Sequence, residues 1–209
     1  MKKLIPLLAI LLVSASCVRS FAQTEDLATA VSAGKVSVTF HGTGGSSGDS
    51  IEATVVTTPK AGGDLVLTMA PGTRLQSENS SDQNMVIAGV KGQVIDENSY
   101  TPKTEIRASG TTTTYVFDAY CTDFEKDNPS TGTKFTLGKV DPVLACIFNE
   151  ASSTVIKQAA VWIYTDKASF SHVNDKFTVS QSDWDAAATI VSKCSASAGK
   201  PTQTTTPKP

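Results

Sequence analysis

Residues 36–40 read Val-Ser-Val-Thr-Phe, so apolar and polar side chains alternate along this stretch. A period of two predicts a β-strand with one face in a core and the other in water. The same pattern returns at three further places, Ile51–Val55, Leu65–Met69 and Tyr115–Ala119. The segments between these strands carry the Gly, Pro, Asn and Ser residues that turns require. We therefore expect a β-sandwich or barrel that follows a short N-terminal helix and ends near Tyr120.

Beyond Cys121 the apolar period changes from that of a strand to that of a helix. Ser152 or Ser153 can cap a helix that runs to about Tyr164. Its apolar stripe consists of Val155, Ile156, Ala159, Ala160 and Ile163. The sequence therefore predicts an α+β fold that is mostly β, with a helical subdomain over residues 121–194 behind the β-rich body of residues 23–120.

Two further helices are expected, one at each end of the globular part. Thr24 can cap a helix over Glu25–Ala33, which Gly34 would end. Ser182 can cap a helix over Asp183–Cys194. From residue 195 to residue 209 the chain is rich in Ser, Thr, Lys and Pro, a composition that predicts a disordered tail.

The first 22 residues have the pattern of a secretory signal peptide. The apolar run Leu4–Val13 follows Lys2 and Lys3 and is too short to cross a bilayer. Small residues precede an expected cleavage between Ala22 and Gln23. The pattern predicts an exported protein, periplasmic, secreted or on the cell surface, with no transmembrane segment in the mature chain.

A second interpretation of this N-terminus makes Cys17 the lipidated first residue of a lipoprotein. Ala15 and Ser16 fit such a signal, but Ser14 stands where Leu is usual. The cleavage after Ala22 fits better, and it leaves the mature chain with 15 basic and 20 acidic residues, a formal charge of −5. An acidic exported chain is unsuited to binding nucleic acid or anionic membranes.

After cleavage three cysteines remain, Cys121, Cys146 and Cys194. In an oxidising compartment two of them can pair, and one is left over. Cys121 comes at the end of the last predicted strand, directly after Tyr120, whereas the other two belong to the predicted helical part. The odd count therefore leaves one thiol that is either inert and buried or chemically reactive.

Cys121 and Gln158 lie in two motifs that together resemble the thioester domains of bacterial surface proteins. In that family an aromatic residue or Leu precedes a reactive Cys, and a second motif reads Thr-Gln-x-Ala-(Ile/Val)-Trp. Here Tyr120-Cys121 matches the first motif, and Gln158-Ala159-Ala160-Val161-Trp162 matches the second. Lys157 departs from the pattern, since it stands in place of the Thr.

The resemblance implies an internal thioester between Cys121 and Gln158 that captures an amine once, without enzymatic turnover. The amine would belong to a surface molecule or to a protein lysine. Tyr120 and Trp162 would shield the bond, because residues four apart share one helix face. Lys157 is rotated about 100° from Gln158 and is expected to face solvent. If the thioester uses Cys121, then Cys146 and Cys194 are free to form a disulfide.

A second hypothesis is a non-reactive, immunoglobulin-like envelope module that binds or scaffolds noncovalently. In that case Cys121 is a free thiol or pairs with another cysteine, and Gln158 only makes hydrogen bonds. Two acids, Asp118 and Asp123, flank Cys121 and would raise the pKa of its thiol if they point toward it.

Other motifs predict neither a cofactor nor a metal. The loop Gly42–Gly48 has Ser47 where a dinucleotide fingerprint needs Gly, so it indicates a hairpin loop. Asp123, Glu125 and Asp127 alternate like a calcium loop, but Asn and Pro follow where the sharp-turn Gly belongs. The two histidines share no ligand spacing with the cysteines.

Overall fold

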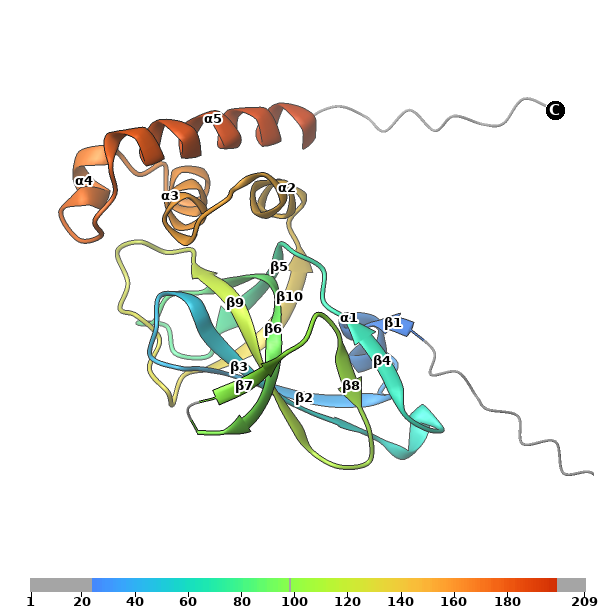
Figure 1. Cartoon of the computed structure of the whole chain (residues 1–209). Helices are drawn as coiled ribbons and strands as arrows, with labels where there is room; N and C mark the ends of the chain where they lie inside the picture. Colours follow the sequence, from blue (N-terminus) through green and yellow to red (C-terminus); the bar gives the residue numbers. More distant parts are fainter. Residues whose placement is uncertain (1–23, 98, 199–209) are drawn as a thin grey trace, which may run out of the picture.

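The computed structural model describes residues 24–97 and 99–198. The predicted signal peptide, Cys17 and the last eleven residues lie outside the described residues. The body is a β-barrel, and a layer of helices lies over one of its ends (Figure 1). The fold is thus α+β and mostly β, with a barrel body and helices at the C-terminal side, as the sequence predicted.

Six antiparallel strands form the barrel, in the order β5-β10-β2-β3-β9-β6, and pairing of β5 with β6 closes it. Closure leaves the barrel without an unpaired edge over these strands. The strand β7 (Ser99–Pro102) continues from β6 as a hairpin. The six barrel strands are β2 (Val36–Gly42), β3 (Ser47–Thr57), β5 (Thr73–Ser77), β6 (Met85–Asp96), β9 (Thr113–Cys121) and β10 (Lys134–Val140).

The alternating patterns that predicted the strands point apolar residues into the barrel. On β3, Ile51, Ala53 and Val55 are fully buried. On β9, Phe117 and Tyr115, which pair with Ile51 and Ala53, are buried as well. Phe40 of β2 meets Phe117 of β9 edge to face, with ring centroids 6.1 Å apart. Apolar burial of this kind is the main term that favours folding.

A small second sheet packs beside the barrel, in the order β1-β4-β8. Its strands are β1 (Thr24–Asp26), β4 (Leu65–Thr68) and β8 (Ile106–Ala108), and the 3-10 helix η1 (Pro59–Ala61) precedes β4. Helix α1 (Leu27–Ser32) begins two residues later than predicted, because Thr24–Asp26 pairs with β4 as a strand. Asp26 therefore caps α1 in place of Thr24, with its carboxylate accepting from the Thr29 N–H at 3.0 Å.

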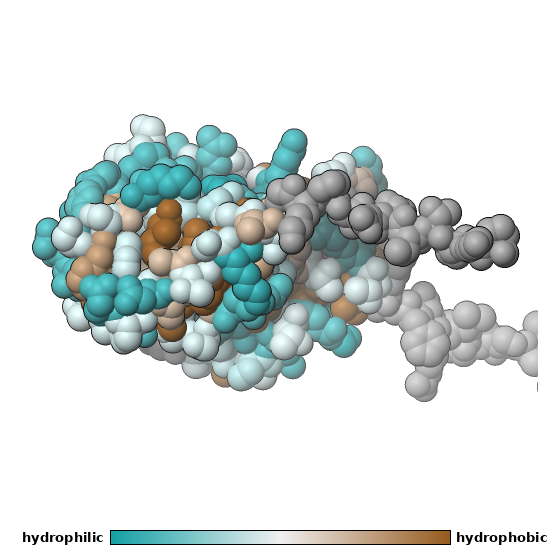
Figure 2. Space-filling model, turned by 90° about the horizontal axis from the view of Figure 1, so that it is seen from above, coloured by the Kyte–Doolittle hydropathy of each residue, from teal (hydrophilic) through white to brown (hydrophobic). Residues whose placement is uncertain are grey.

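The helical layer contains α2 (Pro142–Glu150), α3 (Thr154–Thr165), α4 (Phe170–Asn174) and α5 (Gln181–Ala198). Helix α3 follows the prediction, and the Ser153 hydroxyl caps it by accepting from the Ile156 N–H at 3.2 Å. Seen from the helical side, apolar residues show at the surface with polar residues around them (Figure 2). Over the described ranges, no helix has the length and apolar character needed to cross a membrane.

Three predicted boundaries on the C-terminal side also differ from the structure. Strand β10 follows Cys121 and belongs to the barrel, so the helical layer begins at Pro142 and not at Cys121. Helix α5 begins earlier than predicted because Ser180, not Ser182, caps it, with its hydroxyl accepting from the Asp183 N–H at 3.1 Å. The same helix continues to Ala198, so the first four residues of the predicted tail are helical.

Candidate functional site

Strand β9 and helix α3 bring Cys121 and Gln158 into direct contact. Cys121 is the last residue of β9, and Gln158 lies in the second turn of α3. The Cys121 N–H donates to Gln158 Oε1 at 3.2 Å, and Gln158 Nε2 donates to the Cys121 carbonyl at 2.9 Å. Both residues are fully buried. The two residues of the predicted site are therefore neighbours, 37 positions apart in the chain.

The contact forms where β3 stops pairing with β9. The last pair of that ladder is Ser47 with Tyr120, so the next residue, Cys121, extends past the start of β3. Its N–H donates to the Ser46 carbonyl at 3.1 Å as well as to Gln158. Buried backbone groups and buried amides both need partners, and the carboxamide of Gln158 meets both needs here.

The sulfur of Cys121 contacts β6, the strand that pairs with β9 on the side away from β3. Cys121 pairs with Met85 of β6, and its Sγ lies 3.4 Å from Met85 Sδ. Burial in these surroundings raises the pKa of the Cys121 thiol far above its ordinary value, and the negative charge of Asp123 adds to the rise. At neutral pH the thiol is therefore protonated.

The other two described cysteines, Cys146 and Cys194, form a disulfide between α2 and α5 with a Cα–Cα distance of 5.6 Å. That distance lies in the usual range for a disulfide. Cys121 is the free cysteine of the described chain. No bridge competes with Gln158 for its sulfur in this arrangement.

The two predicted shielding residues are buried beside the pair. Tyr120 is 0% exposed and packs on Phe148, with ring centroids 5.3 Å apart. Trp162, one turn after Gln158, is 4% exposed and meets Phe124 and Phe177 edge to face at 4.8 and 5.3 Å. Aromatic packing of this kind excludes water from the side of α3 that carries Gln158.

Lys157 does not face solvent as the sequence suggested. Its side chain is 20% exposed, and its Nζ donates to Asp118 Oδ2 at 2.9 Å. The ammonium also lies 5.6 Å from the centre of the Tyr120 ring. Although Lys157 lies about 100° around the helix from Gln158, its long aliphatic side chain folds back and brings the ammonium to Asp118 of β9. The charge of Asp118 is thus balanced by Lys157, which leaves Asp123 as the acid that acts on the thiol.

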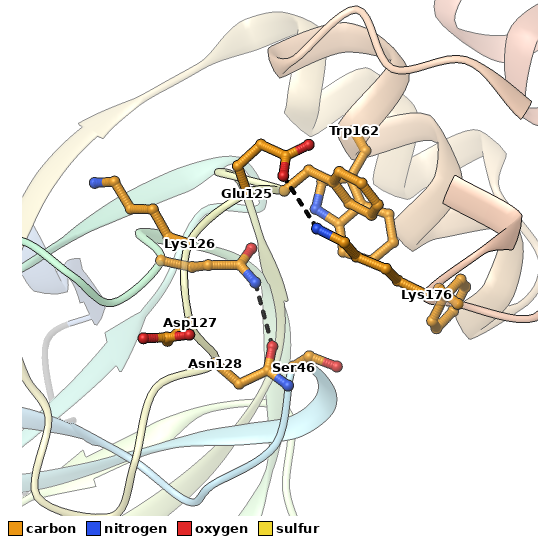
Figure 3. Close-up of a pocket in the computed structure, with 10 residues that line it drawn as sticks. Ser46, Glu125, Lys126, Asp127, Asn128, Trp162 and Lys176 are labelled. Carbon is orange, nitrogen blue, oxygen red and sulfur yellow. Dashed lines mark hydrogen bonds and ion pairs between the residues drawn. The ribbon is translucent and has the colours of Figure 1, made fainter. Parts of the chain in front are cut away.

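A pocket of about 300 Å³ adjoins this site, and sequence reasoning missed it. Figure 3 shows the Glu125–Lys176 ion pair beside Trp162 in this pocket, with Ser46 and Asn128 on the other side. No motif in the sequence marked this pocket, because Gln83, in the loop before β6, was not predicted as part of the site. The lining residues are Ser46, Gln83, Phe124, Glu125, Lys126, Asp127, Asn128, Trp162, Lys176 and Phe177.

The acids that resembled a calcium loop have other roles in the structure. Asp123 accepts from the Asn84 N–H at 2.7 Å, and Glu125 pairs with Lys176 at 3.0 Å and with His172 at 2.8 Å. Among residues 24–97 and 99–198, no group of three or more His, Cys, Asp or Glu side chains could hold a metal ion.

Comparison with known proteins finds no match: no protein-family model, no curated protein and no solved structure is similar to this chain.

Proposed function

We propose that the chain forms a thioester between Cys121 Sγ and the side-chain carbonyl carbon of Gln158, and that this bond captures an amine covalently. The observation that supports it is the docking of the Gln158 carboxamide on the backbone of Cys121 by two hydrogen bonds. A carboxamide is inert to thiols in solution. The fold fixes the carboxamide on the backbone of the residue that carries the thiol, and the effective molarity of well-oriented groups lowers a barrier by up to roughly 7 to 11 kcal/mol.

In the first step the sulfur of Cys121 attacks the carbonyl carbon of Gln158. The C–S bond forms, the C–N bond breaks, and the thiol proton leaves with Nε2 as ammonia. The Cys121 N–H at 3.2 Å from Oε1 is placed to stabilise the negative charge that develops on that oxygen. The Cys121 carbonyl holds the leaving nitrogen at 2.9 Å. The thiolate is the attacking species and the thiol is protonated at rest, so its proton must pass from Sγ to Nε2 as the C–S bond forms.

In the second step an amine attacks the same carbon, forms an amide with the side chain at position 158 and releases the Cys121 thiol. The protein is then spent, which makes the reaction a single covalent capture and not enzymatic turnover. Buried Tyr120 and Trp162 would slow hydrolysis of the thioester before the amine arrives.

The setting we propose is outside the cytoplasm, in attachment to a surface. The signal-peptide pattern of residues 1–22 and the Cys146–Cys194 disulfide both favour an oxidising compartment. The partner would be an amine-bearing surface molecule or a protein lysine.

Intact-mass spectrometry of the mature protein tests this proposal. We expect a mass one ammonia below that of the disulfide-bonded sequence, and methylamine should add its full mass at Gln158. Cys121→Ala and Gln158→Ala should show neither effect. A native chain at full mass, unreactive to methylamine and with an alkylatable Cys121, would refute the thioester. Peptide mapping must first exclude Glu at position 158, which prior hydrolysis would leave.

The second candidate is a non-reactive envelope binding or scaffold module. It is favoured by the same two hydrogen bonds, since they also satisfy the buried backbone groups of Cys121 at the end of β9 without any covalent step. The Lys157 departure from the thioester motif points the same way. A full-mass chain would support this candidate.

A further inference from the structure

Three residues that line the pocket beside Trp162 are neighbours of the Cys121–Gln158 pair, which is itself fully buried and does not line the pocket. Ser46 lines it, and the Ser46 carbonyl accepts from the Cys121 N–H. Trp162 lines it one helical turn after Gln158. Gln83 lies two residues before Met85, whose sulfur contacts Cys121 Sγ. A molecule that reaches the thioester carbon from solvent through this pocket meets these three residues.

Two buried polar atoms on the walls of this pocket have no hydrogen-bond partner: Gln83 Oε1, an acceptor, and Trp162 Nε1, a donor. Gln83 is 3% exposed and Trp162 is 4% exposed. The Gln83 amide nitrogen donates to Asn128 Oδ1 at 3.2 Å, which leaves the oxygen as the free end. Buried polar groups without partners are destabilising and rare, so a donor and an acceptor on the same pocket indicate a group that would satisfy both.

An exposed ion pair borders the pocket on the solvent side. Glu125 and Lys176 pair at 3.0 Å with side chains 62% and 53% exposed, and Figure 3 shows them next to Trp162. Exposed ion pairs contribute little to stability, so these two side chains can move aside at small cost. Their movement would give a ligand access to the buried atoms behind them.

We propose that this pocket selects primary amines that carry a hydroxyl group close to the amino group; this inference rests on the proposed thioester. A hydroxyl can donate to Gln83 Oε1 and accept from Trp162 Nε1 at the same time. Trp162 follows Gln158 by one turn of α3, so a hydroxyl held at Trp162 Nε1 belongs to a ligand beside the residue that the amine attacks. Amino alcohols, including amino sugars, have this arrangement, whereas a lysine side chain offers only methylenes near its amine.

Two amines of similar basicity and size test the hydroxyl. Ethanolamine can donate and accept, whereas 2-methoxyethylamine can only accept. We expect native protein to react with ethanolamine roughly tenfold faster, the factor of about one added hydrogen bond. Gln83→Met should abolish that preference, and Trp162→Phe should slow both amines. Gln76→Met, at an exposed site on β5, and Trp184→Phe, in α5, are the matched controls that should keep it. Equal rates in the native protein would overturn the inference.

Failure of the thioester itself is distinguished by a binding measurement. We expect ethanolamine, and not 2-methoxyethylamine, to shift the indole N–H resonance of Trp162 in Cys121→Ala, which cannot react. Trp162→Phe assigns that signal, and the Trp184 signal serves as the internal reference. A missing ammonia loss in the native chain rejects the thioester alone. A Trp162 signal that ethanolamine does not shift rejects the proposed selectivity of the pocket. Ordered water would then be the partner of Gln83 Oε1 and Trp162 Nε1.

Discussion

The primary amide of Gln158 is 0% exposed, and both its oxygen and its nitrogen form hydrogen bonds with the backbone of one residue, Cys121. That arrangement fixes the plane of the carboxamide against strand β9. If no thioester forms, the carboxamide only satisfies the backbone at the end of β9. If a thioester forms, the same arrangement is the one from which ammonia leaves. The two cases differ in whether a buried thiol persists at Cys121, and a thiol titrates whereas a thioester does not.

The pH dependence of unfolding therefore separates these cases. Gln158→Met keeps the side-chain volume but cannot form a thioester, so it retains the Cys121 thiol. Because burial raises the folded-state pKa of this thiol, the unfolded chain loses its proton first, from about pH 8.5. Stability is then complete below that pH and falls as the pH rises, by about 1.4 kcal/mol per unit.

Urea unfolding of Gln158→Met at pH 7.5, 8.5 and 9.5 would measure this loss. All three pH values lie below the ordinary pKa of tyrosine, about 10. The double variant Cys121→Ala/Gln158→Met is the control and should lack the alkaline loss. Native protein should lack it too if its sulfur is held in a thioester. Equal slopes in the single and double variants would contradict the prediction.

Trp162 gives a second prediction at the scale of one residue. Trp162→Ala removes a ring packed against Phe124 and Phe177, which should lower the free energy of unfolding by roughly 3 to 5 kcal/mol. It should also admit water, so that the ammonia-deficient mass converts within hours to a form with Glu at position 158. Trp184→Ala, on α5 away from Gln158, should leave the mass deficit stable. An equally durable deficit in Trp162→Ala would show that this ring does not shield the bond.

At the scale of elements, the sequence predicted β2, β3, β4 and β9 from their alternation and missed others, β6 and β10 among them. Strand β6 begins with the continuous apolar run Met85–Ile87, buried throughout, which has no period of two. Helix α2 did carry a usable signal, since Asp141 caps it and Pro142 takes its first position. Helix α3 was predicted because its cap and its apolar stripe agree.

The disulfide between α2 and α5 is the basis of a prediction at this scale. It closes a separation of 48 residues, and in the loop-entropy model its removal should cost roughly 3 to 4 kcal/mol. Cys146→Ala/Cys194→Ala should therefore speed amide hydrogen exchange in α5 and leave the barrel strands protected. The ammonia deficit should persist, because neither residue takes part in the Cys121–Gln158 bond. Uniformly faster exchange in the barrel would instead show that the two layers unfold as one unit.

At the scale of the whole molecule, the barrel and the helical layer meet at the predicted site. The motifs predicted which two residues would be close, but not how, because the contact depends on the β3–β9 ladder ending at the Ser47–Tyr120 pair, one residue before Cys121. Sequence periodicity does not contain that register. The pocket was beyond prediction for the same reason, since Ser46, Gln83 and Trp162 come from three distant segments.

A thioester would also be a covalent link between these two layers, and its loss should change the stability of the whole protein. The bond would close a separation of 37 residues, worth roughly 3 to 4 kcal/mol in the loop-entropy model. For a domain of this size, that corresponds to a fall in Tm of roughly 6 to 16 °C when methylamine opens the bond. Calorimetry before and after methylamine measures the fall, and the disulfide stays intact in both samples. Cys121→Ala should show no response to methylamine, because it lacks the link. An unchanged Tm in a native sample whose mass confirms aminolysis would mean that the two hydrogen bonds between Gln158 and Cys121 already hold barrel and helices together without the covalent bond.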